Sequence, residues 1–266
     1  MFQIPDSDAP PLTIDQCIVS RKMKDLKAKV HDVRSRIEWA CEKAGRKPSE
    51  ITVLAVSKGH PAVRIRQLHK FGLSAFGENY LREAVEKQAQ LADLDLKWHF
   101  IGPVQSNKTR VLAQYFDWVQ SADREKVLRR LSLQRSEALP KLNICIQVNI
   151  DREEQKAGVL PENLEELVHF ALDLPNLRLR GLMVIPRQAS AHHDPARSYR
   201  KMDDLFRSLV SSGISLDTLS MGMSADLEHA IMHGSTMLRI GTDLFGVRAS
   251  RKNPPTTQGK RGQTET

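Results

Sequence analysis

Lys58 stands where an α/β protein could use a reactive amine. It ends the run 51–58, in which six of eight residues are apolar or β-branched, and Gly59 and Pro61 follow it. A short run of this kind, stopped by glycine and proline, predicts a strand buried on both faces of a parallel sheet. Ligands of α/β folds bind at the carboxyl ends of such strands, and a lysine is rarely buried without a partner or a task. The alternative is a lysine whose ammonium group extends off the strand into water.

Two later segments have the composition of a phosphate site. Residues 221–224 precede an expected helix and end in the hydroxyl of Ser224, and residues 239–242 combine an arginine with a glycine and a threonine. A helix N-terminus with a hydroxyl, and a glycine whose backbone can approach closely, suit an anionic phosphate. Ser224 could equally be an ordinary helix N-cap. An arginine, a phosphate site and a strand-end lysine together favour pyridoxal 5′-phosphate held as a Schiff base.

The elements that would position these residues alternate along the chain. After an amphipathic helix from Met23 to Ala44, helices separate eight expected strands, which are 51–58, 75–79, 98–102, 118–121, 142–150, 179–185, 218–221 and 237–241. Such alternation implies a parallel sheet. Eight βα units in roughly 200–250 residues match a closed (β/α)8 barrel better than an open sheet. The expected fold class is α/β, a single TIM-type barrel with an extra N-terminal helix.

In a barrel all strand ends meet at one mouth, so residues far apart in sequence converge there. Besides Lys58, the expected strand ends carry Asn79, His99, Asn149 and Met183. No GxGxxG motif follows a strand, which weakens a dinucleotide-binding alternative.

The chain divides into one folded domain with two flanking segments. We expect a barrel over 21–247, a loosely ordered segment over 1–20 and a disordered basic tail over 248–266, with no room for a second folded domain.

Charge and cysteine content limit the possible partners and location. The formal net charge is +8. A basic surface can bind nucleic acid, but aromatic residues are only 5%, and attraction of anionic small molecules explains the charge equally well. Three scattered cysteines, no signal peptide and no apolar run near ~18 residues predict a cytoplasmic protein without a membrane partner. We also expect a monomer that does not bind nucleic acid.

Six segments are more specific. They are Ala-Val-Ser-Lys at 55–58, Phe-Gly-Glu-Asn-Tyr at 76–80, Trp-His-Phe-Ile-Gly-Pro-Val-Gln-Ser-Asn-Lys at 98–108, Arg-Gly-Leu-Met at 180–183, Gly-Met-Ser at 222–224 and Gly-Ser-Thr-Met-Leu-Arg-Ile-Gly-Thr at 234–242. In this order they resemble the YggS/PROSC-type pyridoxal phosphate homeostasis proteins. That family is similar to the barrel domain of alanine racemase, a fold-type III cofactor enzyme.

The resemblance implies a site for pyridoxal 5′-phosphate. The chain departs from the family at Gly59 and His60, where another polar or basic residue usually follows the lysine, and this concerns the rim of the pocket. The implied roles are the Schiff-base lysine for Lys58, a position facing the pyridine nitrogen for Arg239, phosphate contacts for Ser224, Gly241 and Thr242, and the ring pocket for Asn79 and Met183.

The implied function is vitamin B6 homeostasis, in which the protein stores, buffers or delivers the cofactor without robust turnover. Free amino acids and pyridoxal-phosphate-dependent enzymes are the further expected partners. An amino-acid racemase with the same cofactor stays open as the alternative, and a nucleic-acid binder as a remote one. A metal site is not expected, because His229 and His233 are four residues apart but lack the glutamate of an HExxH motif.

Overall fold

The computed structural model describes residues 14–187 and 194–246. Residues 1–13, 188–193 and 247–266 lie outside the described residues. The expected basic tail is therefore outside them, as is the first part of the expected N-terminal segment.

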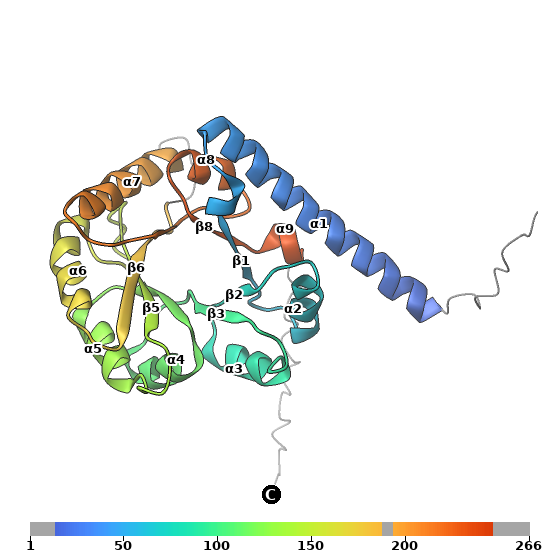
Figure 1. Ribbon diagram of the computed structural model, residues 1–266, viewed down its shortest axis with the longest axis horizontal. Coiled ribbons are helices and arrows are strands. Elements are labelled where there is room, and N and C mark those ends of the chain that lie inside the picture. Colours follow the sequence, from blue (N-terminus) through green and yellow to red (C-terminus); the bar gives the residue numbers. More distant parts are fainter. Residues whose placement is uncertain (1–13, 188–193, 247–266) are drawn as a thin grey trace, which may run out of the picture.

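Eight parallel strands close into a barrel in chain order, and β1 pairs with both β2 and β8 (Figure 1). This confirms the predicted α/β barrel and all eight expected strands, although the apolar runs extend past several strand ends. The strands are β1 (Thr52–Val56), β2 (Ala75–Glu78), β3 (Lys97–Phe100), β4 (Trp118–Ala122), β5 (Leu142–Gln147), β6 (Leu177–Met183), β7 (Thr218–Ser220) and β8 (Met237–Ile240).

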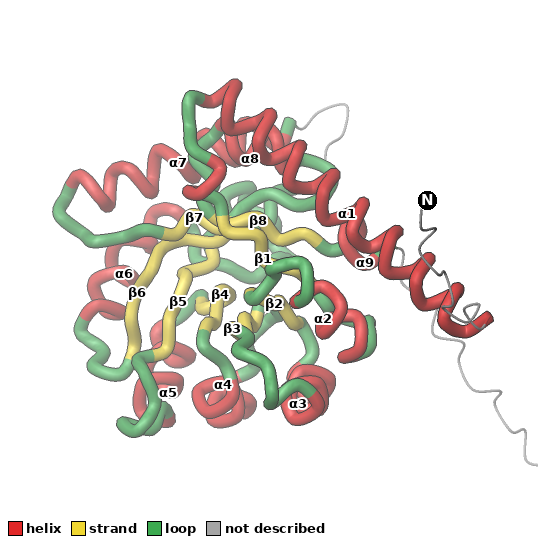
Figure 2. The backbone as a smooth tube through the Cα atoms, turned by 45° about the vertical axis from the view of Figure 1, so that its right-hand side comes forward, coloured by secondary structure: helices red, strands yellow, loops and turns green. Residues whose placement is uncertain are grey.

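Helices connect the successive strands and surround the barrel (Figures 1 and 2). Among the described residues they are α1 (Ile14–Ala44), α2 (Ala62–His69), α3 (Leu81–Gln90), α4 (Thr109–Tyr115), α5 (Glu125–Gln134), α6 (Leu164–Leu172), α7 (Pro195–Ser211), α8 (Leu227–Met232) and α9 (Thr242–Phe245), with 3-10 turns η1 (Pro48–Glu50), η2 (Ser106–Lys108) and η3 (Pro161–Asn163). Within the described ranges no helix is both long and apolar enough to cross a membrane.

The long helix α1 lies outside the ring of helices and contacts both α8 and α9 (Figure 1). It begins at Ile14, earlier than the expected start at Met23. Its apolar positions Leu26, Val30, Val33 and Ile37 are buried, which is the one-sided pattern of a helix packed on its own domain.

The buried residues form two clusters, as a closed barrel requires. The larger cluster joins the strands to the surrounding helices, and Ala55 and Phe76 belong to it. The smaller one fills the barrel interior and consists of Leu54, Val56, Ile101, Trp118, Cys145, Met183 and Met237. Leu54 and Val56 of β1 are in this interior cluster, and Lys58 follows the strand after Val56.

Two aspartates at the starts of helices have different roles. Asp194 caps α7, since its carboxylate accepts a hydrogen bond of 2.9 Å from the Ala196 N–H. Asp123 does not cap α5, whose N-cap residue is Arg124, and its carboxylate pairs with the Arg124 guanidinium instead.

Candidate functional site

The residues predicted for the cofactor site lie at one end of the barrel, where the strands have their carboxyl ends. They come from five strands that are far apart in the sequence. They are Lys58 after β1, Asn79 after β2, Met183 at the end of β6, Ser224 after β7, and Arg239, Gly241 and Thr242 in or after β8.

The loop after β8 lies directly beside the strand that carries Lys58. Ala55 pairs with Ile240 in the β1–β8 register. A Cβ added to Gly241 would lie 3.7 Å from both the Cβ and the carbonyl oxygen of Val56. The lysine and the predicted phosphate loop are therefore neighbours in space.

Lys58 lies in a tight turn at the end of β1. The His60 N–H donates to the Ser57 carbonyl at 3.0 Å, and Gly59 has φ +75°, a left-handed conformation that glycine adopts without strain. The His60 ring stacks on Phe245 with 4.8 Å between ring centroids. The departure from the family at Gly59-His60 thus has a structural role here, because the glycine allows the turn and the histidine joins it to α9.

Arg239 is a buried cation with its hydrogen bonds directed at the barrel wall. One terminal nitrogen donates to the carbonyl and hydroxyl oxygens of Ser220 at 2.7 and 2.8 Å, and the other donates to the Val184 carbonyl at 2.7 Å. Burial lowers the pKa of Arg239, but an arginine side chain stays protonated in proteins. The guanidinium is therefore a fixed positive charge at the base of the mouth.

A polar chain continues from Arg239 along the barrel interior. The Ser220 hydroxyl donates to Gln120 Oε1 at 2.7 Å, and Gln120 Nε2 donates to His99 Nδ1 at 2.9 Å. Burial lowers the pKa of His99 to about 3, with Arg180 as a smaller cause. His99 is therefore neutral, and its remaining proton is on Nε2.

The expectation that His99 lies at the mouth is wrong. It pairs in register with Gly77 within β3 and stacks on Trp118 at 4.9 Å, nearer the opposite end of the barrel. Ile101, two residues later on the same face, is the interior residue that follows it toward the mouth. Asn149 has a local role, because its amide nitrogen donates to the Glu153 carbonyl at 2.9 Å and so orders its own loop.

Ser224 belongs to a joint between the loops after β7 and β8. Its hydroxyl accepts a hydrogen bond of 3.4 Å from the Asp243 N–H. It is not the N-cap of α8, which is Asp226, so the ordinary-cap alternative is wrong.

Arg36 of α1 fastens this joint. Its guanidinium binds the Asp243 carboxylate at 2.6 Å, the Glu228 carboxylate at 2.6 and 2.9 Å, and the Ser224 carbonyl at 2.9 Å. Sequence reasoning missed Arg36, because its partners are nearly the whole barrel away along the chain.

Asn79 has an unused hydrogen-bond acceptor near the mouth. Its Oδ1 atom is buried and has no hydrogen-bond partner among the described residues, and such an atom costs free energy unless a donor reaches it. Asn79 also lines a groove of about 960 Å³ between α3 and α4, together with Tyr80, Phe100 and Lys108. The Met183 side chain is fully buried in the barrel interior.

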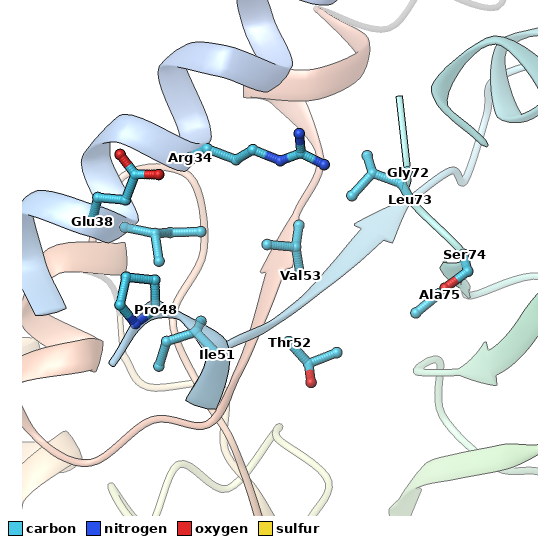
Figure 3. Close-up of a pocket in the computed structure, with 11 residues that line it drawn as sticks. Arg34, Glu38, Pro48, Ile51, Thr52, Val53, Gly72, Leu73, Ser74 and Ala75 are labelled. Carbon is cyan, nitrogen blue, oxygen red and sulfur yellow. The ribbon is translucent and has the colours of Figure 1, made fainter. Parts of the chain in front are cut away.

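A second pocket lies away from this chemistry. It has a volume of about 350 Å³ and lies between α1 and the amino-terminal ends of β1 and β2. Figure 3 shows Arg34 extending from α1 toward Gly72 and Leu73 across this pocket, where its guanidinium donates to the Phe71 carbonyl at 2.7 Å. Lys58 follows the opposite end of β1, so the mouth is the better candidate site.

Comparison with known proteins shows the family of the chain. The family model described as "Alanine racemase, N-terminal domain" matches residues 29–249. The pyridoxal phosphate homeostasis protein of Pseudomonas aeruginosa is 50% identical over 226 residues, which cover 85% of this chain and 97% of the relative. The structure of PipY from Synechococcus elongatus PCC7942 with PLP bound is 33% identical, with a TM-score of 0.71 over 83% of this chain and 100% of that chain.

A more distant likeness concerns the fold alone. Alanine racemase of Clostridium difficile 630 is 15% identical, with a TM-score of 0.65 over 86% of this chain and 58% of that chain. Fold and mouth thus define a parallel (β/α)8 barrel of the alanine racemase type, with a lysine at the end of its first strand. Within this class, the chain belongs to the family of pyridoxal phosphate homeostasis proteins, as the six segments indicated.

Proposed function

We propose that this protein binds pyridoxal 5′-phosphate covalently through Lys58 and serves vitamin B6 homeostasis rather than catalysis. The observation that carries the proposal is the position of Lys58 just after β1, a strand that lies beside the loop after β8. The names of its relatives and the bound PLP of PipY support the choice of ligand. When bound, the cofactor supplies an aldehyde that condenses with the Lys58 amine, so that a C=N bond forms and one water molecule leaves.

The neighbouring residues fit the other parts of this ligand. In the proposal Ser224, Gly241 and Thr242 hold the phosphate, and Arg239 faces the pyridine nitrogen. The joint between the loops after β7 and β8 supports the first assignment, and the buried positive charge supports the second. Asn79 and Met183 line the ring pocket, where the unpartnered Asn79 Oδ1 can accept a hydrogen bond from the ligand.

Two features favour holding the cofactor over turnover. A permanently charged arginine disfavours protonation of the pyridine nitrogen, and an unprotonated ring is a weaker electron sink. Racemisation also needs acid–base groups on both faces of the substrate carbon, and in alanine racemases a tyrosine serves the face opposite the lysine. Here Tyr80 and Tyr115 are exposed, and the Tyr199 hydroxyl donates to Asp226 at 2.7 Å.

Chemical trapping tests the proposal. Borohydride reduces a C=N bond to a stable amine, so reduction followed by peptide mapping should find a pyridoxyl group on the peptide that contains Lys58. Lys58→Ala should lose the yellow absorbance of the bound cofactor. A pyridoxyl group on another lysine alone would overturn the assignment.

The wider role follows from this site. We propose a cytoplasmic monomer whose partners are the cofactor, free amino acids that exchange with Lys58, and enzymes that receive the cofactor, but not nucleic acid or membranes. The thiols of Cys41 and Cys145 are free and buried, in keeping with a reducing compartment. Gel filtration with light scattering tests the oligomeric state.

A further inference from the structure

A buried ionic cluster lies directly behind the Lys58 turn. It consists of Glu78 at the end of β2 and of Glu83 and Lys87 on α3. The Lys87 ammonium group binds the Glu78 carboxylate at 2.6 Å and the Glu83 carboxylate at 2.7 Å. The side chain of Glu78 is fully buried, and those of Lys87 and Glu83 are 6% and 20% exposed.

Such a cluster is a poor way to stabilise a fold. Removing charges from water costs several kcal/mol per ion by order of magnitude, and apolar side chains of similar size often serve stability better. Here two carboxylates share one ammonium group, and Glu78 Oε2 has no hydrogen-bond partner among the described residues. Burial accordingly raises the pKa of Glu78. Fold stability alone therefore does not explain why these three charged residues are buried together.

Its contacts supply one. The Lys87 ammonium group donates to the Ser57 carbonyl at 2.7 Å, and the Ser57 hydroxyl donates to the Glu78 carboxylate at 2.6 Å. The Gly59 N–H donates to the Glu83 carboxylate at 2.6 Å. These three hydrogen bonds hold the residues immediately before and after Lys58.

We propose that Glu78, Glu83 and Lys87 are positioning residues that fix the backbone of Lys58 so that its amine points into the barrel mouth. This inference rests on the proposed function. Strand β1 ends at Val56, so the sheet does not hold the turn that follows. The cluster joins the end of β2 to α3, outside the barrel interior, so it can fix the turn without touching a ligand in the mouth. A misplacement of ~1 Å at a reacting group can cost on the order of 100-fold in rate.

The experiment compares two ligands that differ in one group. Pyridoxal 5′-phosphate carries the aldehyde that reacts with Lys58, and pyridoxine 5′-phosphate carries an alcohol that cannot. In Lys87→Met we expect the rate constant for bond formation with the aldehyde, followed by stopped-flow absorbance, to fall roughly 10- to 100-fold. Binding of pyridoxine 5′-phosphate, followed by protein fluorescence, should stay within a factor of about 2, because that ligand needs no aligned amine.

Further variants keep the test independent of folding defects. Glu83→Ala removes the acceptor of the Gly59 N–H but leaves the buried pair of Lys87 and Glu78 intact, and it should slow bond formation severalfold. Glu83→Gln keeps a carbonyl acceptor at that position and should restore most of the rate. The matched control is Arg82→Met, which breaks the exposed pair with Glu86 on the same helix and should change neither ligand.

The outcomes separate the two proposals. Equal losses for both ligands in Lys87→Met and Glu83→Ala, or no loss for either, would overturn the positioning role. A wild-type protein that binds pyridoxine 5′-phosphate but forms no bond between Lys58 and the aldehyde would overturn the proposed function itself.

Discussion

The guanidinium of Arg36 lies 2.6 Å from the carboxylate of Asp243 and thereby ties the N-terminal helix to the loop after the last strand. The same group holds Glu228 and the Ser224 carbonyl. α1 is thus more than a cover for the barrel, because it fixes the two loops that we assign to the phosphate.

Arg36→Met should therefore weaken the binding of phosphate-bearing ligands indirectly, because Arg36 acts through the loops that hold the phosphate. We expect affinity for pyridoxal 5′-phosphate to fall roughly tenfold, since hydrogen bonds to charged groups contribute ~1.5–3 kcal/mol each and the loops retain other contacts. Affinity for phosphate-free pyridoxal should change much less. Lys29→Met is the matched control, because it breaks the Lys29–Asp25 pair on the same helix. Equal losses for the two ligands in Arg36→Met would show general damage to the mouth instead.

Ser224→Ala tests the phosphate assignment directly. Losing one side-chain hydrogen bond to a charged group costs roughly 1.5–3 kcal/mol, or about 10- to 150-fold in affinity. The loss should appear in titrations with pyridoxal 5′-phosphate and be nearly absent with pyridoxal. If both ligands lose the same affinity, Ser224 does not contact the phosphate.

His99 should make the protein sensitive to acid. The pKa of His99 is lowered to about 3 in the folded protein, against ~6.5 in the unfolded chain. Between these values the unfolded state binds the extra proton, so the free energy of unfolding falls as the pH falls from 6.5 toward 3. Urea titrations at pH 7 and pH 4.5 should show a larger loss for wild type than for His99→Gln. Parallel losses in the two proteins would mean that His99 does not titrate in this window.

The protein should exchange amino acids at its cofactor but catalyse little. Amines can replace Lys58 on the aldehyde, so amino acids should change the absorbance spectrum of the loaded protein. Proton abstraction needs the electron sink that Arg239 limits. In deuterated water we expect negligible deuterium at the α-carbon of L- or D-alanine by NMR. Stereospecific incorporation at enzyme-like rates would favour the racemase alternative.

The alternation of apolar runs with amphipathic segments was sufficient to predict the barrel, because each strand and helix is encoded locally. The sequence also predicted that Lys58, Ser224 and Gly241 lie at the same end of the barrel, since a barrel brings all strand ends to one mouth. The error at His99 has a different cause. The apolar run in which it lies does not show where β3 ends, and a difference of two residues along a strand moves a side chain away from the mouth toward the opposite end of the barrel.

Arg36 and Lys87 could not have been predicted. Both look like ordinary surface charges on helices, and the sequence contains many others. Their importance depends on partners in other elements, such as Asp243 for Arg36 and the Ser57 carbonyl for Lys87. Only tertiary packing distinguishes them from the exposed arginines and lysines nearby.

The pairing of β1 with β8 has a consequence for folding. Of the contacts between neighbouring strands in the barrel, this one closes the longest loop, and long-range closure is slow and costly in entropy. A ligand that bridges Lys58 and the Gly241 loop can bind only after this closure. It would therefore bind the closed state alone and add to its stability by mass action, about 2.7 kcal/mol at 100 times its dissociation constant. In this architecture a bound cofactor would therefore add to the stability of the pairing between the first and last strands.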